Sequence, residues 1–177
     1  MVPSLWQIAG ASIVMVGSSL YGREFSLRFR ARPQELRQLA SMLRSLRADI
    51  SYQRLPLQEA FLHASRQGQS GAALSDLFLT ASNELAHPGS TALDAWHVAL
   101  QIHAPRMHLV TEDRQILESL GHSIGVSGVA EQAAHLDAAL AQLVDREKDA
   151  MEERARYERV YQTLGVLAGV LIVVLLI

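Results

Sequence analysis

The 177-residue sequence contains no cysteine and a single lysine, Lys148. The absence of cysteine excludes a disulfide scaffold, a thiolate zinc site, an iron–sulfur cluster and a cysteine nucleophile. No phosphate-loop motif contains the lysine, none of the seven histidines belongs to a dense ligand cluster, and no nucleophile-elbow motif follows a strand pattern. The sequence therefore predicts no enzymatic activity, no catalytic or metal-binding residue and no cofactor.

Charge of one sign is not in excess, because 18 acidic residues nearly balance 16 basic ones. This balance gives no indication of nucleic-acid binding. Hydrophobic residues make up 49% of the chain and the mean hydropathy is +0.11. Such a composition excludes an intrinsically disordered chain, and the length corresponds to one domain.

Both ends of the chain lack charge, since no Asp, Glu, Lys or Arg occurs in residues 1–22 or 160–177. Residues 164–177 are apolar on all faces and reach roughly 21 Å as a helix, short of the ~30 Å hydrocarbon core. Adding residues 160–163 brings the segment close to spanning length. We predict a transmembrane helix at 160–177, with a buried hydrophobic C-terminal helix as the alternative.

The N-terminal segment, residues 1–22, is less apolar, and a cleaved signal peptide is its alternative interpretation. A signal peptide carries positive charge before its apolar core, whereas here the arginines follow it. Arginines also precede residues 160–177, and positive flanks mark the cytoplasmic side of membrane helices. The sequence predicts a two-pass membrane protein whose residues 23–159 form a cytoplasmic domain. Gly165 and Gly169 have the spacing of closely packed membrane helices, although glycine is common in such helices in general.

Apolar residues in the middle of the chain recur at helical spacing. The first stripe has intervals of 3, 4, 3 and 4 residues: Leu36, Leu39, Leu43, Leu46 and Ile50. Further helices are expected to begin near Pro56, after a Ser70 cap, after Thr91 with Asp94 as a capping box, and near Thr111, where Glu112 and Asp113 complement the helix dipole. A long helix from about Ser127 has its predicted inward face at Val129, Ala133, Leu136, Leu140 and Leu143. The predicted fold class is all-α, an antiparallel helical bundle.

Basic residues gather in one segment, because residues 23–54 hold eight arginines and three acidic residues. Arg37 and Arg44 are seven residues apart, as are Arg47 and Arg54, so each pair is expected on one stripe of a polar helix face. We call these four residues the arginine surface and predict that it binds an acidic partner or anionic lipid headgroups. A merely solvated face that sets membrane topology is the alternative.

Several short motifs, in this order and spacing, resemble the stage III sporulation protein AB family over essentially the whole chain. They are Arg32-Pro33-Gln34-Glu35-Leu36-Arg37-Gln38-Leu39, Ile50-Ser51-Tyr52, Pro56-Leu57-Gln58-Glu59-Ala60-Phe61, Ala95-Trp96, Leu120-Gly121, Ile124-Gly125, Gln132, Tyr157 and Leu164-Gly165-Val166-Leu167-Ala168-Gly169. One departure is Gly128, where the family usually has an Asp that would cap a helix, and Ser127 is the expected substitute.

The resemblance implies a function that periodicity does not show. The family's cytoplasmic domain is similar to the helical F domain of type II secretion and type IV pilus platform proteins. A protein of this kind is expected in the mother-cell membrane around the forespore, as a platform in a channel complex with other membrane proteins. Its expected soluble partner is the complex's secretion-type ATPase, which the platform couples to the membrane assembly. The alternative is a membrane-anchored helical adaptor or regulator that recruits a soluble partner and has no export role.

Overall fold

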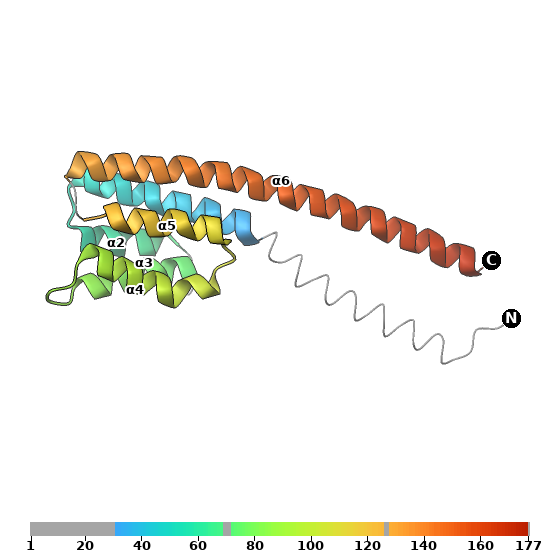
Figure 1. Ribbon diagram of the computed structural model, residues 1–177, viewed down its shortest axis with the longest axis horizontal. Helices are drawn as coiled ribbons and strands as arrows, with labels where there is room; N and C mark the ends of the chain where they lie inside the picture. The colour runs from blue at the N-terminus through green and yellow to red at the C-terminus, as the bar shows by residue number, and fades with distance from the viewer. Residues whose placement is uncertain (1–30, 69–71, 126–127, 177) are drawn as a thin grey trace.

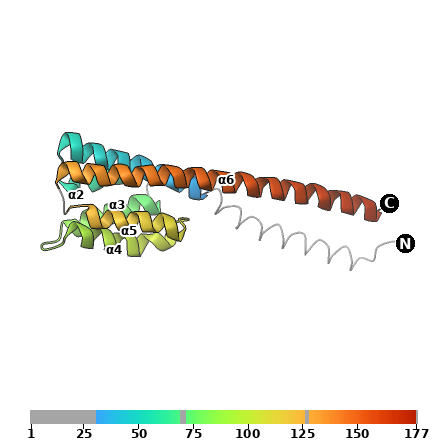
Figure 2. The same ribbon diagram turned by 45° about the horizontal axis from the view of Figure 1, so that its top comes forward.

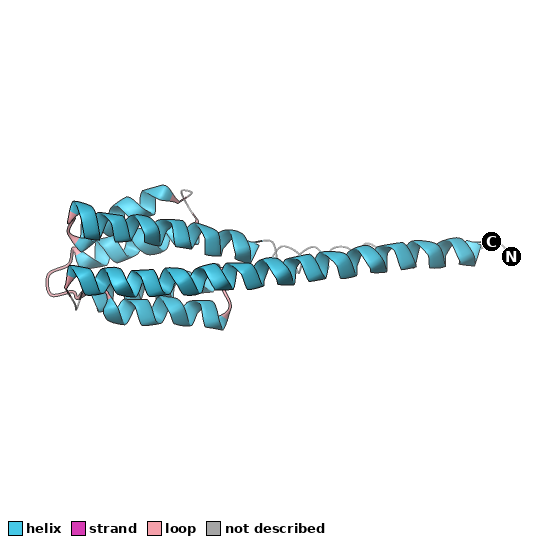
Figure 3. Ribbon diagram, turned by 90° about the horizontal axis from the view of Figure 1, so that it is seen from above, coloured by secondary structure: helices cyan, strands magenta, loops and turns pink. Residues whose placement is uncertain are grey.

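The computed structural model describes residues 31–68, 72–125 and 128–176, with the side chains at 158, 159 and 161–176 excepted. Helices account for nearly all of this part of the chain, and it contains no strand (Figure 3). The first described helix covers residues 31–48 and continues into a π-helical turn, η1, at Asp49–Gln53. The others are α2 (Leu57–Gln67), α3 (Ala73–Leu85), α4 (Ala92–His103), the 3₁₀ turn η2 (Ala104–Arg106), α5 (Thr111–Ser123) and α6 (Val129–Leu176). The predicted all-α class is confirmed.

The hydrophobic core forms where the apolar stripes of these helices meet. All five residues of the first predicted stripe are buried, and so are Ile116, Leu117 and Leu120 of α5. At the centre, the ring of Trp96 stacks on Phe61 at a centroid distance of 5.6 Å and meets Phe78 edge-on at 5.5 Å. The indole N–H of Trp96 donates to the Leu117 carbonyl at 2.8 Å, which satisfies the one polar atom of this buried ring.

Helix starts follow the predicted positions with one correction. Thr91 and Asp94 form the predicted capping box, in which the Asp94 N–H donates to the Thr91 hydroxyl at 3.1 Å. The N-cap of α3 is Ala72, which makes no side-chain cap bond, so the predicted Ser70 cap is wrong. Ser70 itself lies outside the described residues. Gly128 takes the cap position of α6, since its carbonyl accepts from the N–H groups of Glu131 and Gln132.

Helix 31–48 and α6 lie side by side and antiparallel (Figures 1 and 2). Arg37 pairs with Glu147 and Arg47 pairs with Asp137, so ten residues along one helix match ten along the other. With 48 residues, α6 is about 72 Å long and continues far past the bundle toward the C-terminus (Figure 1). The η1–α2 turn lies at the opposite end of the bundle, and we call that end the distal end.

No helix of the described residues is both long and apolar enough to cross a membrane. The predicted span at residues 1–22 lies outside the described residues. The backbone of the predicted span at 160–177 is described to Leu176 as part of α6, but its side chains from residue 161 onward lie outside the description, Gly165 and Gly169 included. Both spans and their packing therefore stay predictions.

Candidate functional site

Two members of the predicted arginine surface, Arg37 and Arg47, form ion pairs within the chain. The Arg37 guanidinium lies 2.7 Å from a carboxylate oxygen of Glu147, and that of Arg47 lies 2.6 Å from one of Asp137. Both carboxylates belong to α6, so these arginines join helix 31–48 to it. Arg37 remains 67% exposed, which leaves most of its side chain open to solvent.

The other two members, Arg44 and Arg54, are exposed and make no ion pair with the described residues. The helix does not carry Arg54 onto the stripe of Arg47, because the π-helical turn intervenes. Arg54 ends that turn with φ +51°, a left-handed conformation. The seven-residue spacing thus predicts a shared face that the backbone does not form.

An ion cluster around the buried Asp113 joins three helices at the end of the bundle from which α6 leaves. Two nitrogens of Arg32 contact both oxygens of Asp113 at 2.9 and 3.1 Å, and a third contacts Glu153 at 2.8 Å. Arg146 adds a contact of 3.1 Å to Asp113. We call these four residues the Asp113 cluster. It links the start of helix 31–48 with α5 and α6.

Asp113 has no solvent exposure, and the side chain of Arg32 is 9% exposed. Burial alone would raise the pKa of Asp113, but the hydrogen bonds and charges of Arg32 and Arg146, with the Val110 N–H, hold that pKa below its ordinary value. The hydrogen bond to Asp113 raises the pKa of Arg32 above its ordinary value. Asp113 is thus a buried carboxylate anion, stable only while both guanidinium groups face it.

From the sequence, Asp113 is predicted only as a first-turn acid that complements the helix dipole, and no contact among Arg32, Asp113 and Arg146 is predicted. A signal was present, since each residue continues an apolar stripe at helical spacing. Arg32 precedes Leu36 by four positions, Asp113 precedes Ile116 and Leu117 by three and four, and Arg146 follows Leu143 by three. Charged residues in register with apolar stripes of different helices indicate that the charges meet.

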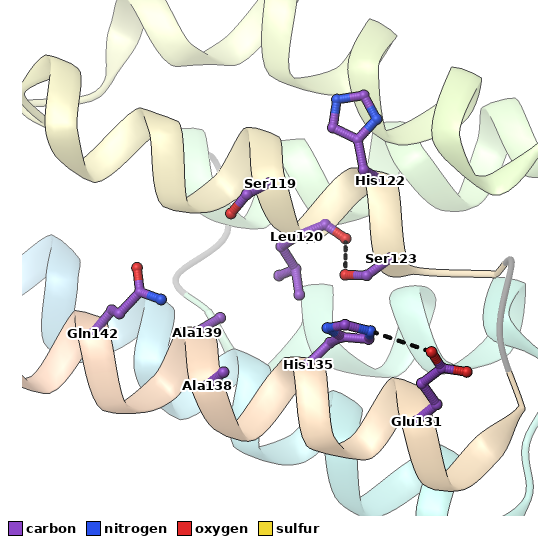
Figure 4. A pocket seen from close by; sticks show the side chains of 9 residues that line it. All are labelled: Ser119, Leu120, His122, Ser123, Glu131, His135, Ala138, Ala139 and Gln142. Carbon is purple, nitrogen blue, oxygen red and sulfur yellow. Dashed lines mark hydrogen bonds and ion pairs between the residues drawn. The ribbon is translucent and has the colours of Figure 1, made fainter.

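A groove of about 440 Å³ runs between α5 and α6 (Figure 4). His135 lies 3.9 Å from Glu131 on its own helix, while His122 projects from α5 away from His135. Ser123 donates to the Leu120 carbonyl at 2.9 Å, an ordinary bond within a helix. Nowhere in the described part of the chain do three or more His, Asp or Glu side chains gather as metal ligands.

Three further histidines make contacts that support the fold. His63 pairs with buried Asp49 at 2.7 Å, and His108 pairs with Glu35 at 2.7 Å. His103 shares a hydrogen bond of 2.9 Å with the Thr80 hydroxyl, and burial lowers its pKa below the ordinary value. His63 joins α2 to the π-helical turn, His103 joins α4 to α3, and His108 joins the loop before α5 to helix 31–48.

Comparison with known proteins matches most of the chain to one family. The model of the family described as stage III sporulation protein AB matches residues 7–177. Stage III sporulation protein AB of Bacillus subtilis (strain 168) is 30% identical over 170 residues, which cover 96% of this chain and 98% of the relative. A solved structure of a stage III sporulation protein AB superimposes with a TM-score of 0.66 at 28% identity, covering 71% of this chain and 98% of that one.

Proposed function

Because the chain belongs to the stage III sporulation protein AB family, we propose that it is a non-enzymatic platform component of a sporulation channel complex. It is anchored in the mother-cell membrane around the forespore and couples a secretion-type cytoplasmic ATPase to the membrane assembly. The resemblance of the family's domain to the F domain of secretion platforms supports this role.

One structural observation carries the proposal: the two helices that lead to the uncharged ends of the chain are fastened to each other. Three ion pairs from helix 31–48 to α6, made by Arg32, Arg37 and Arg47, follow the contact between the two helices. The Arg32 pair with Glu153 lies only a few residues before the uncharged segment 160–177. The ion pairs join helix 31–48 to α6, which supports a role in coupling a soluble partner to a membrane assembly.

Membrane anchoring by both ends is part of the proposal. Residues 1–22 and 160–177 cross the membrane in opposite directions, contact lipid, and place residues 23–159 in the cytoplasm. Gly165 and Gly169 allow α6 to pack closely against a second membrane helix, from this chain or from another membrane protein of the channel. The absence of charge over both segments supports this arrangement.

The function is tested by capture of the ATPase from sporulating cells with the detergent-solubilised full-length protein. Wild-type protein is expected to retain the secretion-type ATPase, identified by mass spectrometry. Reversal of the two arginines that make no ion pair with the described residues, Arg44→Glu with Arg54→Glu, is expected to lower the captured amount by at least about tenfold, because like charges then face an acidic partner.

A matched control reverses Lys148→Glu and Arg66→Glu, which changes the net charge equally on exposed positions outside the arginine surface. Equal capture by wild type and by the Arg44, Arg54 variant would retain the ATPase partner and discard the arginine surface. Failure of wild type to capture the ATPase, with other soluble proteins enriched instead, would contradict the platform function and favour the adaptor.

A further inference from the structure

The distal end of the bundle carries a second groove, of about 690 Å³, between η1, α2 and the start of α6. Its walls are largely apolar, with Ile50, Leu55, Leu57, Leu85 and Val129 among the lining residues. Of the described residues that line it, Arg54 alone is charged. The groove is thus an apolar depression with one cation at its edge.

Val129 shows that this groove is an uncovered extension of the core. It shares the apolar face of α6 with Leu136 and Leu143, which are fully buried, yet Val129 itself is 47% exposed. The apolar face of α6 extends beyond the hydrophobic core here, and no described residue covers its end at Val129. Tyr52, on the adjacent π-helical turn, is 78% exposed. Large exposed apolar side chains beside an apolar depression are typical of protein contact sites.

The backbone at the edge of the groove has two uncommon features. The π-helical turn at Asp49–Gln53 is one, and single π-helical turns occur frequently at functional sites. The left-handed φ of +51° at Arg54 is the other, a strained conformation that residues other than glycine rarely adopt. Glycine would remove this strain but would also remove the guanidinium.

Contacts around Asp49 hold this turn in place. Its buried carboxylate accepts from the Gln53 amide at 2.9 Å and pairs with His63 at 2.7 Å, while its carbonyl accepts from the Leu55 N–H at 3.1 Å. These contacts of Asp49 therefore hold the backbone of the strained Arg54 at the edge of the groove. Its guanidinium makes no hydrogen bond or ion pair with the described residues, so it is available to an external carboxylate.

We propose that this distal groove docks an apolar protein segment that carries a carboxylate, with the apolar side chains in the groove and the carboxylate on Arg54. Charge complementarity selects this occupant, because the lining offers a guanidinium and no acid, and the planar guanidinium binds a carboxylate in two parallel hydrogen bonds. The inference rests on the proposed function for the identity of the partner, the cytoplasmic ATPase. The distal end points away from the C-terminal end of α6 (Figure 1) and hence, in the proposed topology, away from the membrane.

Site-specific photocrosslinking of the full-length protein in sporulating cells tests the groove. The photoreactive residue p-benzoylphenylalanine replaces Val129 in one protein and Val144 in the other. Val144 is a matched control, since it is the same residue type on the same helix, 48% exposed and outside the groove. Crosslinking at position 129 is expected to capture a partner peptide with large apolar residues and an Asp or Glu. Crosslinking at position 144 is expected to capture none of this peptide.

Adding Arg54→Glu is expected to lower the crosslinked yield at position 129 by at least about tenfold, whereas Arg44→Glu leaves it within about twofold. Equal yields at both positions, a crosslink to a second copy of this chain, or no effect of Arg54→Glu would overturn the proposal. Capture of the ATPase without a crosslink at position 129 refutes the groove and retains the proposed function. A crosslink to an apolar, acidic segment of another protein retains the groove and refutes the ATPase assignment.

Discussion

Substitution of Asp113 by asparagine is expected to lower the free energy of unfolding of the bundle by about 3–5 kcal/mol, the range for breaking a buried ion pair from one side. Glu153 would be the one anion of the cluster left to Arg32, and the charge of Asp113 that faces both Arg32 and Arg146 would be lost. The asparagine amide fits the space but cannot neutralise two guanidinium groups. The measurement is urea unfolding in detergent on a Trp6→Phe background, so that the fluorescence of buried Trp96 reports the transition.

The matched control is Asp137→Asn, which removes the same charge from the same kind of ion pair at the surface. Asp137 is 51% exposed and its partner Arg47 is 32% exposed, so water replaces the lost contact. This variant is expected to unfold at the wild-type urea concentration. An equal decrease in the free energy of unfolding in the two variants would show that the buried Asp113 cluster stabilises the bundle no more than a surface ion pair does.

Because the pKa of Asp113 is lowered, the difference in unfolding free energy between wild type and Asp113→Asn is expected to depend on pH. The unfolded chain takes up the proton near the ordinary value of 3.8, whereas the folded protein does so only at lower pH. The stabilisation is therefore complete above about pH 5 and is lost as the pH falls through 3.8 toward the folded pKa. The gap in unfolding free energy between wild type and Asp113→Asn should narrow over that range, and a constant gap would contradict an ionised Asp113.

Substitution of Gly121 by alanine is expected to lower the free energy of unfolding by about 2 kcal/mol. Overpacking at this position is expected to cost about 3 kcal/mol, the upper end of the usual range of 1–3 kcal/mol. The better helix propensity of alanine offsets about 1 kcal/mol of that cost. A Cβ atom at this position would lie 2.4 Å from Cδ1 of Trp96. Trp96 cannot move aside freely, because Phe61 and Phe78 hold its ring and its N–H donates to Leu117. Thermal unfolding followed by circular dichroism measures the loss.

Gly128→Ala is the matched control, because no atom lies within 4 Å of a Cβ built at that glycine. It is expected to change the unfolding free energy by less than about 1 kcal/mol, because the poorer N-cap preference of alanine opposes the gain from a less flexible unfolded chain. A neutral Gly121→Ala would mean that α5 and α4 are farther apart than the Trp96 contact requires.

Local features of the fold were predictable from the sequence because they depend on neighbours in the chain. Spacing within one helix predicts the apolar stripe from Leu36 to Ile50 and the capping box at Thr91. It also predicts the long helix α6, because no Pro or Gly interrupts the sequence after Gly128 until Gly165. The predicted face of α6 was correct at Leu136 and Leu143 but wrong at Val129, because periodicity does not show where the core ends. The π-helical turn was not predicted either, and its Asp49 contacts His63 of another helix, which spacing along the chain does not show.

The candidate site was less predictable, because its charges find partners on other helices. Arg37 and Arg47 looked like a free basic face, yet both have carboxylates on α6 opposite them. The Asp113 cluster joins residues 81 positions apart in the chain. Spacing indicates that a charge lies in an apolar stripe, but the three-dimensional packing decides which opposite charge it meets.

The proposed function requires that both uncharged ends cross the membrane while the bundle remains in the cytoplasm. Since the chain has no native cysteine, single cysteines report topology without background. Ser4→Cys and Gln101→Cys, the latter exposed on α4, are expressed separately in vegetative cells and treated with an impermeant maleimide. With the proposed topology, we expect labelling of Ser4→Cys in intact cells and of Gln101→Cys only after lysis. Labelling of Gln101→Cys but not Ser4→Cys in intact cells would contradict it.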